Sequence, residues 1–282
     1  MTVLRTTFEA SLVGHLEPGP DLLVALDIDG TLVRSDGTVS AGVRAAVRDL
    51  LDAGTHVVLA TGRSVSGLLP VLDALGMTHG DVVAANGAVC ARVDPVLPDR
   101  HEVTDVVTFD PEPALRLLRP LLPDGLFAVE RAGEGFLLTH PFPPGELSGP
   151  VAVVDFEVLC AAPASRVTIR DPKLGADDFR EIVARSGLSG VTYAIGWTAW
   201  LDLTPPGVTK ASGLEILRER LELARDATVA VGDGQNDVEM LRWAGVGVAM
   251  GGADEETARA ADAVAAHVDD DGLVAVLRSL LR

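Results

Sequence analysis

Short apolar runs alternate with helix-like segments near both ends of this 282-residue chain, and this alternation constrains the fold more than any other feature. The apolar runs cover residues 22–27, 56–60 and 228–232, and a segment with helical spacing follows each of them. Continuous apolar runs of this length are typical of strands that are buried on both faces, and strands that alternate with helices form parallel sheets. We therefore predict an α/β fold with a Rossmann-like parallel-sheet core domain.

The texture of the sequence changes in the middle of the chain, where prolines become frequent and strand-like runs outnumber helical ones. We interpret this middle part, residues 87–206, as an inserted α+β cap domain. The core domain is then discontinuous and comprises residues 21–86 and 207–282. Residues 1–20 show neither the strand–helix alternation of the core nor the proline-rich pattern of the middle part, and we expect them to form an N-terminal extension.

Polar residues follow three strands of the predicted sheet at the edge where open parallel sheets bind their ligands. They are Asp27 and Asp29 after the first strand, Thr61, Gly62 and Arg63 after the second, and Asp233, Asn236 and Asp237 after the strand at 228–232. Four carboxylates in one crevice repel one another strongly unless a cation is present. The hard cation Mg²⁺, which prefers oxygen ligands, is the one we expect there.

Each of these motifs is, by itself, also a good loop sequence. The segment 232–237 (GDGQND) contains Gly and Asn, which tolerate positive φ in turns, and the segment 27–31 (DIDGT) can be read as a solvated acidic loop. It could also begin a calcium loop, but the remaining ligand positions of that pattern are missing. The order of the motifs, each at a strand end and with a lysine between them, is what favours a functional site.

The motifs resemble those of the haloacid dehalogenase-like superfamily, and most closely its Cof-type branch, in which a large class IIB cap is inserted. Residues 27–31 are similar to the first motif, Thr61 to the second, Lys210 to the third and residues 232–237 to the fourth. The resemblance covers the whole core domain, but it covers the cap only by size and position. The segment 251–253 (GGA) departs from the family, which often has Asn before this Ala.

The resemblance implies a Mg²⁺-dependent phosphatase that works through an aspartyl-phosphate. Asp27 would be the nucleophile, and Asp29 would be the general acid that protonates the leaving group and then the base that activates water. Metal ligands would come from Asp27, Asp29 (through its main-chain carbonyl) and Asp233, while Asp237 would support the metal or Lys210. The ammonium of Lys210 would lie near both Asp27 and the phosphate.

Only two of the 23 basic residues are lysines, Lys173 and Lys210. A bias toward arginine explains this count by itself. The position of Lys210 within the third motif, however, favours a function, because a compact ammonium suits a crowded anionic pocket better than a wide guanidinium.

The same resemblance implies which residues hold the phosphoryl oxygens. Thr61 and Gly62 would bind them with hydroxyl and main-chain groups, and Asn236 would either bind them through its amide or orient Asp233. Asn86 would face the same crevice, although a plain Asn-Gly turn explains that residue nearly as well. Arg63 either reaches the substrate or pairs with a surface carboxylate.

The expected substrate is a small phosphorylated metabolite, such as a sugar phosphate, that the cap selects. Glu130, Arg131, Arg166 and Tyr193 are candidate cap contacts, and the sequence does not choose among them. Two other functions remain open. One is a phosphosugar mutase of the same fold, and the other is a non-catalytic regulator that binds phosphorylated metabolites, which has no need of a nucleophile beside its metal.

Charge and hydropathy exclude some partners. With 41 acidic and 23 basic residues the formal charge is -18, which argues against nucleic-acid binding because that requires a basic surface. No apolar run is long enough to span a membrane, and the start of the chain does not resemble a secretory signal. We therefore expect a cytoplasmic protein, monomeric or homodimeric, in which Cys90 and Cys160 are reduced thiols.

Overall fold

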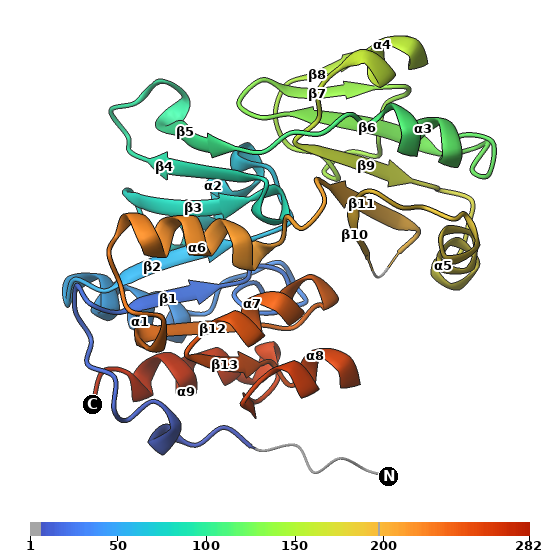
Figure 1. The fold of residues 1–282 in the computed structure, drawn as a ribbon. Coiled ribbons are helices and arrows are strands. Elements are labelled where there is room, and N and C mark those ends of the chain that lie inside the picture. The colour runs from blue at the N-terminus through green and yellow to red at the C-terminus, as the bar shows by residue number, and fades with distance from the viewer. Residues whose placement is uncertain (1–6, 197) are drawn as a thin grey trace.

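The computed structural model describes residues 7–196 and 198–282, which form two β-sheets (Figure 1). The larger sheet has eight strands in the order β14-β13-β12-β1-β2-β3-β4-β5, and the smaller has six in the order β10-β11-β9-β6-β7-β8. The chain leaves the larger sheet after β5 and returns to it through α6. This confirms the predicted α/β fold, with a parallel-sheet core and an inserted cap sheet.

The core sheet is parallel from β14 to β3 and continues as an antiparallel hairpin through β4 and β5. Its strands are β1 (Leu23–Leu26), β2 (His56–Ala60), β3 (Gly80–Ala84), β4 (Val89–Val93), β5 (His101–Val106), β12 (Thr228–Gly232), β13 (Val246–Ala249) and β14 (Ala263–Val264). Because β1 lies between β2 and β12, the residues that follow these three strands emerge side by side at one edge of the sheet.

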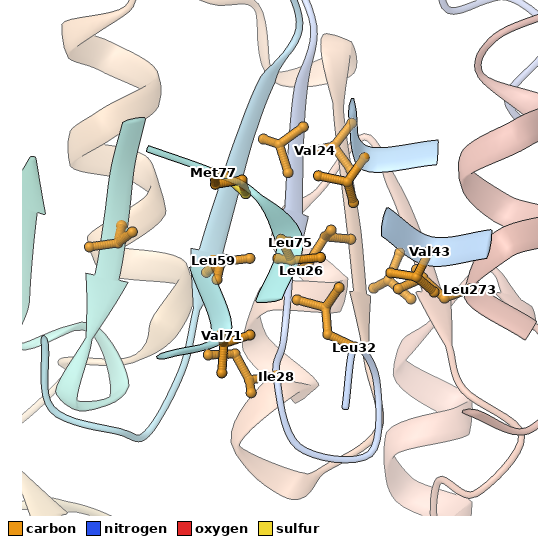
Figure 2. Packing of buried hydrophobic residues seen from close by; sticks show 14 of the residues in the cluster. Val24, Leu26, Ile28, Leu32, Val43, Leu59, Val71, Leu75, Met77 and Leu273 are labelled. Carbon is orange, nitrogen blue, oxygen red and sulfur yellow. The ribbon is translucent and has the colours of Figure 1, made fainter. Parts of the chain in front are cut away.

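Helices cover both faces of the core sheet, which explains the continuous apolar runs in its strands. On one face Val24 and Leu26 pack with α1, α2 and α9, as Figure 2 shows for Val43, Val71 and Leu273. On the other face the alternate residues of β1 pack with α6 and α7. The helices are α1 (Ala41–Asp52), α2 (Val65–Leu75), α6 (Lys210–Arg220), α7 (Val238–Trp243), α8 (Glu255–Ala260) and α9 (Gly272–Ser279), with 3-10 turns at η2 (Ala85–Gly87), η3 (Pro98–Arg100), η4 (Arg225–Ala227), η5 (Gln235–Asp237) and η6 (Val268–Asp270).

The cap sheet has helices on one face only, where Phe127, Ile169 and Leu201 contribute to its own hydrophobic core. Its strands are β6 (Leu126–Arg131), β7 (Gly135–Leu138), β8 (Val151–Val153), β9 (Arg166–Arg170), β10 (Thr192–Ile195) and β11 (Trp200–Thr204), and its helices are α3 (Glu112–Leu118), α4 (Phe156–Ala161) and α5 (Ala176–Arg185). The other face carries polar side chains such as Glu130, Arg166 and Asp202, which are turned toward the core.

Two of the predicted boundaries differ from the structure. Residues 89–106 were expected in the cap, but they form β4 and β5 and extend the core sheet, because the turn at Asn86 folds the chain back antiparallel onto β3. The predicted N-terminal extension begins with residues 1–6, which lie outside the described residues. Residues 7–16 lie against the core: Thr7 pairs with Val264, and Val13, just after η1 (Ala10–Leu12), is fully buried in the core cluster.

Along the described residues, none of the helices combines the length and the apolar character needed to cross a bilayer. Cys90 lies on β4 of the core and Cys160 on α4 of the cap, and both are free and buried.

Candidate active site

The residues that follow β1, β2 and β12 converge at the edge of the core sheet that faces the cap. The Asp27 amide still donates to the Val231 carbonyl (3.0 Å), and the Thr61 amide donates to the Val83 carbonyl (2.9 Å). Each side chain is therefore held at the last ladder position of its strand, directly before the chain turns away. The structure thus brings the residues after these three strands together, as the strand order led us to expect.

Lys210 is the first residue of α6, and its ammonium lies between two buried carboxylates. Its Nζ is 2.5 Å from Asp27 Oδ1 and 2.7 Å from Asp237 Oδ1. Burial disfavours the charged amine, but the negative charges of Asp237 and Asp27 outweigh burial and raise the pKa of Lys210 above its usual value. The helix start is fixed by reciprocal hydrogen bonds between Thr209 and Ser212, so the amine is aimed at Asp27 by a capped helix.

Asp27, Asp233 and Asp237 form a buried carboxylate cluster in which one oxygen of each lies within 4.8 Å of the others. Burial and the charges of Asp237 and Asp233 raise the pKa of Asp27 well above its usual value, although Lys210 opposes this shift. Burial, followed by repulsion from Asp237, raises the pKa of Asp233 to about 6. Lys210 alone therefore leaves this cluster with an excess of negative charge, and its all-oxygen donor set fits a hard divalent cation.

Asp29 was predicted to bind the metal through its main-chain carbonyl and Asp237 to support the metal or Lys210, and the carboxylates of both have protein partners. Asp237 Oδ1 accepts from Lys210, and its Oδ2 accepts from the amides of Asp233 and Gly234, both at 2.9 Å. Asp237 thus orients the lysine and the loop after β12. Asp27 and Asp233 remain as the carboxylates best placed for a cation.

The Asp29 carboxylate is exposed (62%) and is bound by Arg63 through two hydrogen bonds. Arg63 Nε lies 2.9 Å from Oδ2, and Nη2 lies 2.5 Å from Oδ1. The hydrogen bond that Arg63 donates to Asp29 is the main cause that raises the pKa of Arg63. The carboxylate that Arg63 contacts therefore belongs to the site itself, a pairing that sequence reasoning did not anticipate.

Of the predicted phosphate-binding residues, Thr61, Gly62, Arg63, Asn86 and Asn236 line the same crevice, whereas Lys210 lies buried behind Asp27. Thr61 Oγ1 accepts from the Arg63 amide at 3.1 Å, and Asn236 Nδ2 donates to Asn86 Oδ1 at 2.9 Å. Asn86 has a left-handed backbone (φ 53°), which lets it close the turn after β3 while its amide donates to the Thr61 carbonyl at 3.0 Å. Asn86 therefore both closes the turn after β3 and lines the crevice, so the two explanations offered for it from the sequence both hold.

A cavity of about 460 Å³ extends from this crevice to the cap. The cap side chains that line it include Phe136, Glu146, Ser148, Arg166, Arg180, Trp200 and Asp202. Of the four cap candidates, Arg166 lines the cavity and Glu130 binds Arg166, whereas Arg131 pairs with Glu134 at the surface and Tyr193 is 46% exposed. Glu146 and Asp202 were missed because they come from separate segments of the cap and share no local pattern. Trp200 could be expected from the sequence either to stack on the substrate or to pack in the core, and it lines the cavity.

Gly30 is needed where the loop after β1 passes Asp233. Its φ is +84°, and a Cβ built there would lie 2.2 Å from Asp233 Oδ2. We expect Gly30→Ala to lower the free energy of unfolding by about 1–3 kcal/mol through backbone strain, and to weaken Mg²⁺ binding by about 10-fold or more because Asp233 is displaced.

Gly37→Ala is the matched control, because Gly37 has a φ of +81° with nothing within 4 Å of a built Cβ. This substitution should lower stability without changing Mg²⁺ affinity, as measured by urea unfolding and calorimetric titration. Equal Mg²⁺ affinities for the two variants would contradict a role of the Gly30–Asp233 contact in the metal site.

The raised pKa of Asp233 predicts a pH dependence of both stability and metal binding. With a folded pKa of about 6 against 3.8 in the unfolded chain, the folded state binds the proton more tightly, so this residue's contribution to stability falls as the pH rises toward 6. Mg²⁺ must displace that proton below pH 6, and its affinity should then fall about tenfold for each proton displaced and each pH unit. Calorimetric titration at pH 5.0 and 7.5 tests this, and equal affinities would count against the cluster as the metal site.

Comparison with known proteins places this geometry in a family context. A family model described as haloacid dehalogenase-like hydrolase matches residues 24–111 and 152–277. A phosphoglycolate phosphatase from Natronomonas pharaonis is 32% identical over 255 residues, which cover 90% of this chain and 95% of that protein. The solved structure of BT1666 from Bacteroides thetaiotaomicron, described among phosphatases of the HAD enzyme superfamily, is 29% identical with a TM-score of 0.73, and the match covers 94% of this chain and 96% of that one.

The chain also matches part of a longer protein. The chloroplastic endoribonuclease YBEY from Arabidopsis thaliana is 26% identical over 264 residues, or 88% of this chain, but the match spans only 44% of that protein's own length.

Proposed function

Because the chain belongs to the haloacid dehalogenase-like hydrolase family, and within it to the Cof-type phosphatases with a class IIB cap, we propose that it hydrolyses a small phosphomonoester through a covalent intermediate on Asp27. The observation that carries this proposal is the 2.5 Å contact between the Lys210 ammonium and Asp27 at the base of the cavity. A buried lysine with a raised pKa stays charged there and offsets the repulsion between a carboxylate and an incoming phosphate dianion.

Asp27 is the proposed nucleophile. Since its Oδ1 accepts from Lys210, Oδ2 is the oxygen that attacks phosphorus, and the bond between phosphorus and the leaving oxygen breaks. Asp29 then takes a proton from a water molecule, which attacks the phosphorus of the aspartyl-phosphate; the bond between phosphorus and Asp27 breaks, inorganic phosphate leaves, and the Asp27 carboxylate and the protonated Asp29 are restored. Thr61, Gly62, Asn236 and Lys210 hold the phosphoryl oxygens during both steps.

Asp29 is the proposed acid and base, and Arg63 controls it. While Arg63 binds both of its oxygens, the Asp29 carboxylate is held by the guanidinium and not by a leaving group. A phosphoryl dianion attracts the same guanidinium, because Arg pairs with phosphate as readily as with carboxylate. We propose that substrate draws Arg63 away, which makes Arg63 a phosphate ligand and frees Asp29 to protonate the leaving oxygen.

Mg²⁺ is the proposed metal, held by Asp27, Asp233 and the main-chain carbonyl of Asp29. When bound, it supplies positive charge that neutralises the transferring phosphoryl group. The buried, all-oxygen cluster with raised pKa values supports this choice. Asp237 acts through Lys210 and the loop after β12.

The proposed substrate is a small phosphorylated metabolite with hydroxyl groups, such as a sugar phosphate. The cap side of the cavity carries the carboxylates of Glu146 and Asp202, which accept hydrogen bonds from hydroxyls, beside the indole of Trp200. The cap excludes water and selects the leaving group.

A panel of phosphate esters tests the proposal. It should contain p-nitrophenyl phosphate, several sugar phosphates and phosphoglycolate, each assayed with Mg²⁺ and with EDTA. We expect release of inorganic phosphate that requires Mg²⁺ and that EDTA reduces to background. Isomer formation without release would indicate a mutase, and metal and ester binding without turnover of any ester would indicate a regulator.

A further inference from the structure

Arg166 is a cap residue that reaches the main chain of the phosphate-binding loop. It is the first residue of β9, it is 4% exposed, and it lines the cavity. Its Nη1 donates to the carbonyl oxygen of Gly62, which lies in the core between Thr61 and Arg63. A buried, charged side chain of the cap thus forms a hydrogen bond with the main chain of the core.

Three strands of the cap hold this guanidinium in place. Nε and Nη2 of Arg166 each lie 2.7 Å from Glu130 Oε2, and Nη1 lies 3.5 Å from Asp202 Oδ1. Glu130 is the cross-strand partner of Arg166 on β6, and Asp202 on β11 is itself bound by the Thr168 hydroxyl at 2.7 Å. The guanidinium carbon lies 5.8 Å from the centre of the Phe136 ring. The arginine is therefore fixed within the cap.

The loop on the core side is held at each neighbour of Gly62. The Thr61 carbonyl accepts from the Asn86 amide at 3.0 Å, and the Arg63 carbonyl accepts from the Ala85 amide at 2.8 Å. Arg166 supplies the donor for the carbonyl between them. The cap thereby completes the hydrogen bonding of a loop whose other carbonyls are satisfied within the core.

The peptide group that Arg166 contacts connects directly to the Thr61 side chain. The Gly62 carbonyl and the Arg63 amide belong to one planar peptide group, and that amide donates to Thr61 Oγ1 at 3.1 Å. Because Thr61 Oγ1 accepts this hydrogen bond, its own hydroxyl proton is left to donate to a phosphoryl oxygen. The chain of contacts runs from the Arg166 guanidinium through one peptide plane to the threonine hydroxyl, and such chains strengthen one another.

We propose that Arg166 is a positioning residue that orients the Gly62–Arg63 peptide and the Thr61 hydroxyl for phosphate only when the cap is seated on the core. This inference rests on the proposed function, because it assigns Thr61 to the phosphate. If so, both domains contribute to the phosphate site. Binding of the leaving group by the cap and binding of phosphate by the core then favour each other.

Two variants test the inference, and both preserve the charge balance around Glu130. Arg166→Lys keeps a cation beside Glu130, but one ammonium cannot span Glu130, Asp202 and the Gly62 carbonyl. The double variant Glu130→Gln with Arg166→Met removes the buried pair together, so that Glu130 is not left as an unpaired charge, and Asp202 keeps its hydrogen bond from the Thr168 hydroxyl. Arg116→Met is the matched control, because Arg116 forms ion pairs with Glu112 and Glu157 at the cap surface, away from the cavity.

The affinity for inorganic phosphate in the presence of Mg²⁺, measured by calorimetry, is the first readout. We expect both variants to bind phosphate roughly 10- to 100-fold more weakly than the wild type, in line with the cost of a misplaced positioning group. The control should bind as the wild type does. Wild-type affinity in both variants would overturn the inference.

Thr61→Val distinguishes positioning from a general effect on the cap. If Arg166 acts through the threonine hydroxyl, adding Arg166→Lys to Thr61→Val should change phosphate affinity little further, whereas independent roles would give additive losses. Additive losses would overturn the inference. This readout is binding and does not depend on turnover. A wild-type protein that binds phosphate but hydrolyses no ester would refute the proposed phosphatase activity, while the phosphate affinities of the variants would still decide the inference about Arg166.

Discussion

Replacing Asp27 with Asn is expected to reduce phosphate release by about 10⁴-fold or more, as removal of a nucleophile does in other enzymes that use covalent catalysis. The amide keeps the shape of the side chain, but it cannot attack phosphorus. The protein should stay folded, because burial and the charges of Asp237 and Asp233 already disfavour an ionised Asp27. Lys210 retains its contact with Asp237 at 2.7 Å, so its charge is not left unpaired.

Phosphate release and thermal unfolding, measured on the same preparation, check this expectation. Asp52→Asn is the control, since Asp52 is an exposed residue at the end of α1, remote from the cavity. If Asp27→Asn retained more than a few per cent of the wild-type rate while folded, Asp27 would not be the nucleophile.

Replacing Lys210 with Met should remove both the activity and much of the stability. The substitution leaves Asp27 and Asp237 buried without their cation, and breaking a buried ion pair in this way costs about 3–5 kcal/mol. We expect this loss in urea unfolding at pH 7.5 without Mg²⁺, together with loss of ester hydrolysis.

The effect of Lys210→Met should depend on pH. Lys210 opposes the rise in the pKa of Asp27 and of Asp233, so without the ammonium these two pKa values rise further above those of the unfolded chain. The folded state then takes up protons as the pH falls and regains stability between pH 7.5 and 5. Lys173→Met is the control, since Lys173 pairs with Asp124 at the surface (2.8 Å), where water screens the pair and it should contribute little to stability. A pH-independent loss, or equal losses for the two lysines, would contradict the buried cluster.

The convergence of Asp27, Thr61 and Asp233 was predictable from the sequence because strand order and apolar runs are local signals. Parallel strands end at one edge of a sheet, so residues directly after three neighbouring strands must meet there. The position of Lys210 was harder to predict from the sequence. Its helix has a clear start at Thr209, but the motif resemblance was needed to place the amine beside Asp27.

The boundary of the cap was mislocated because β5 carries no apolar alternation in its sequence. Its partly buried positions are His101, Val103 and Asp105, and its apolar Val106 is exposed, so only the structure shows that one face of this strand is covered. The contacts of Arg63 with Asp29 and of Arg166 with Gly62 had no sequence signal either. They join segments that are distant in the chain, and only packing of the complete fold brings them together.

The insertion of the cap between β5 and α6 also has a consequence for synthesis on the ribosome. β1 needs β12 as a neighbour, and the two segments of the site are separated by about 200 positions, as in the Thr31–Asp233 hydrogen bond with its separation of 202. At the usual pace of translation the nascent chain therefore waits roughly 10 to 40 s with one side of β1 unpaired. The cap, which is complete before β12 emerges, is free to fold during that interval, and a chaperone that shields β1 would find its target there.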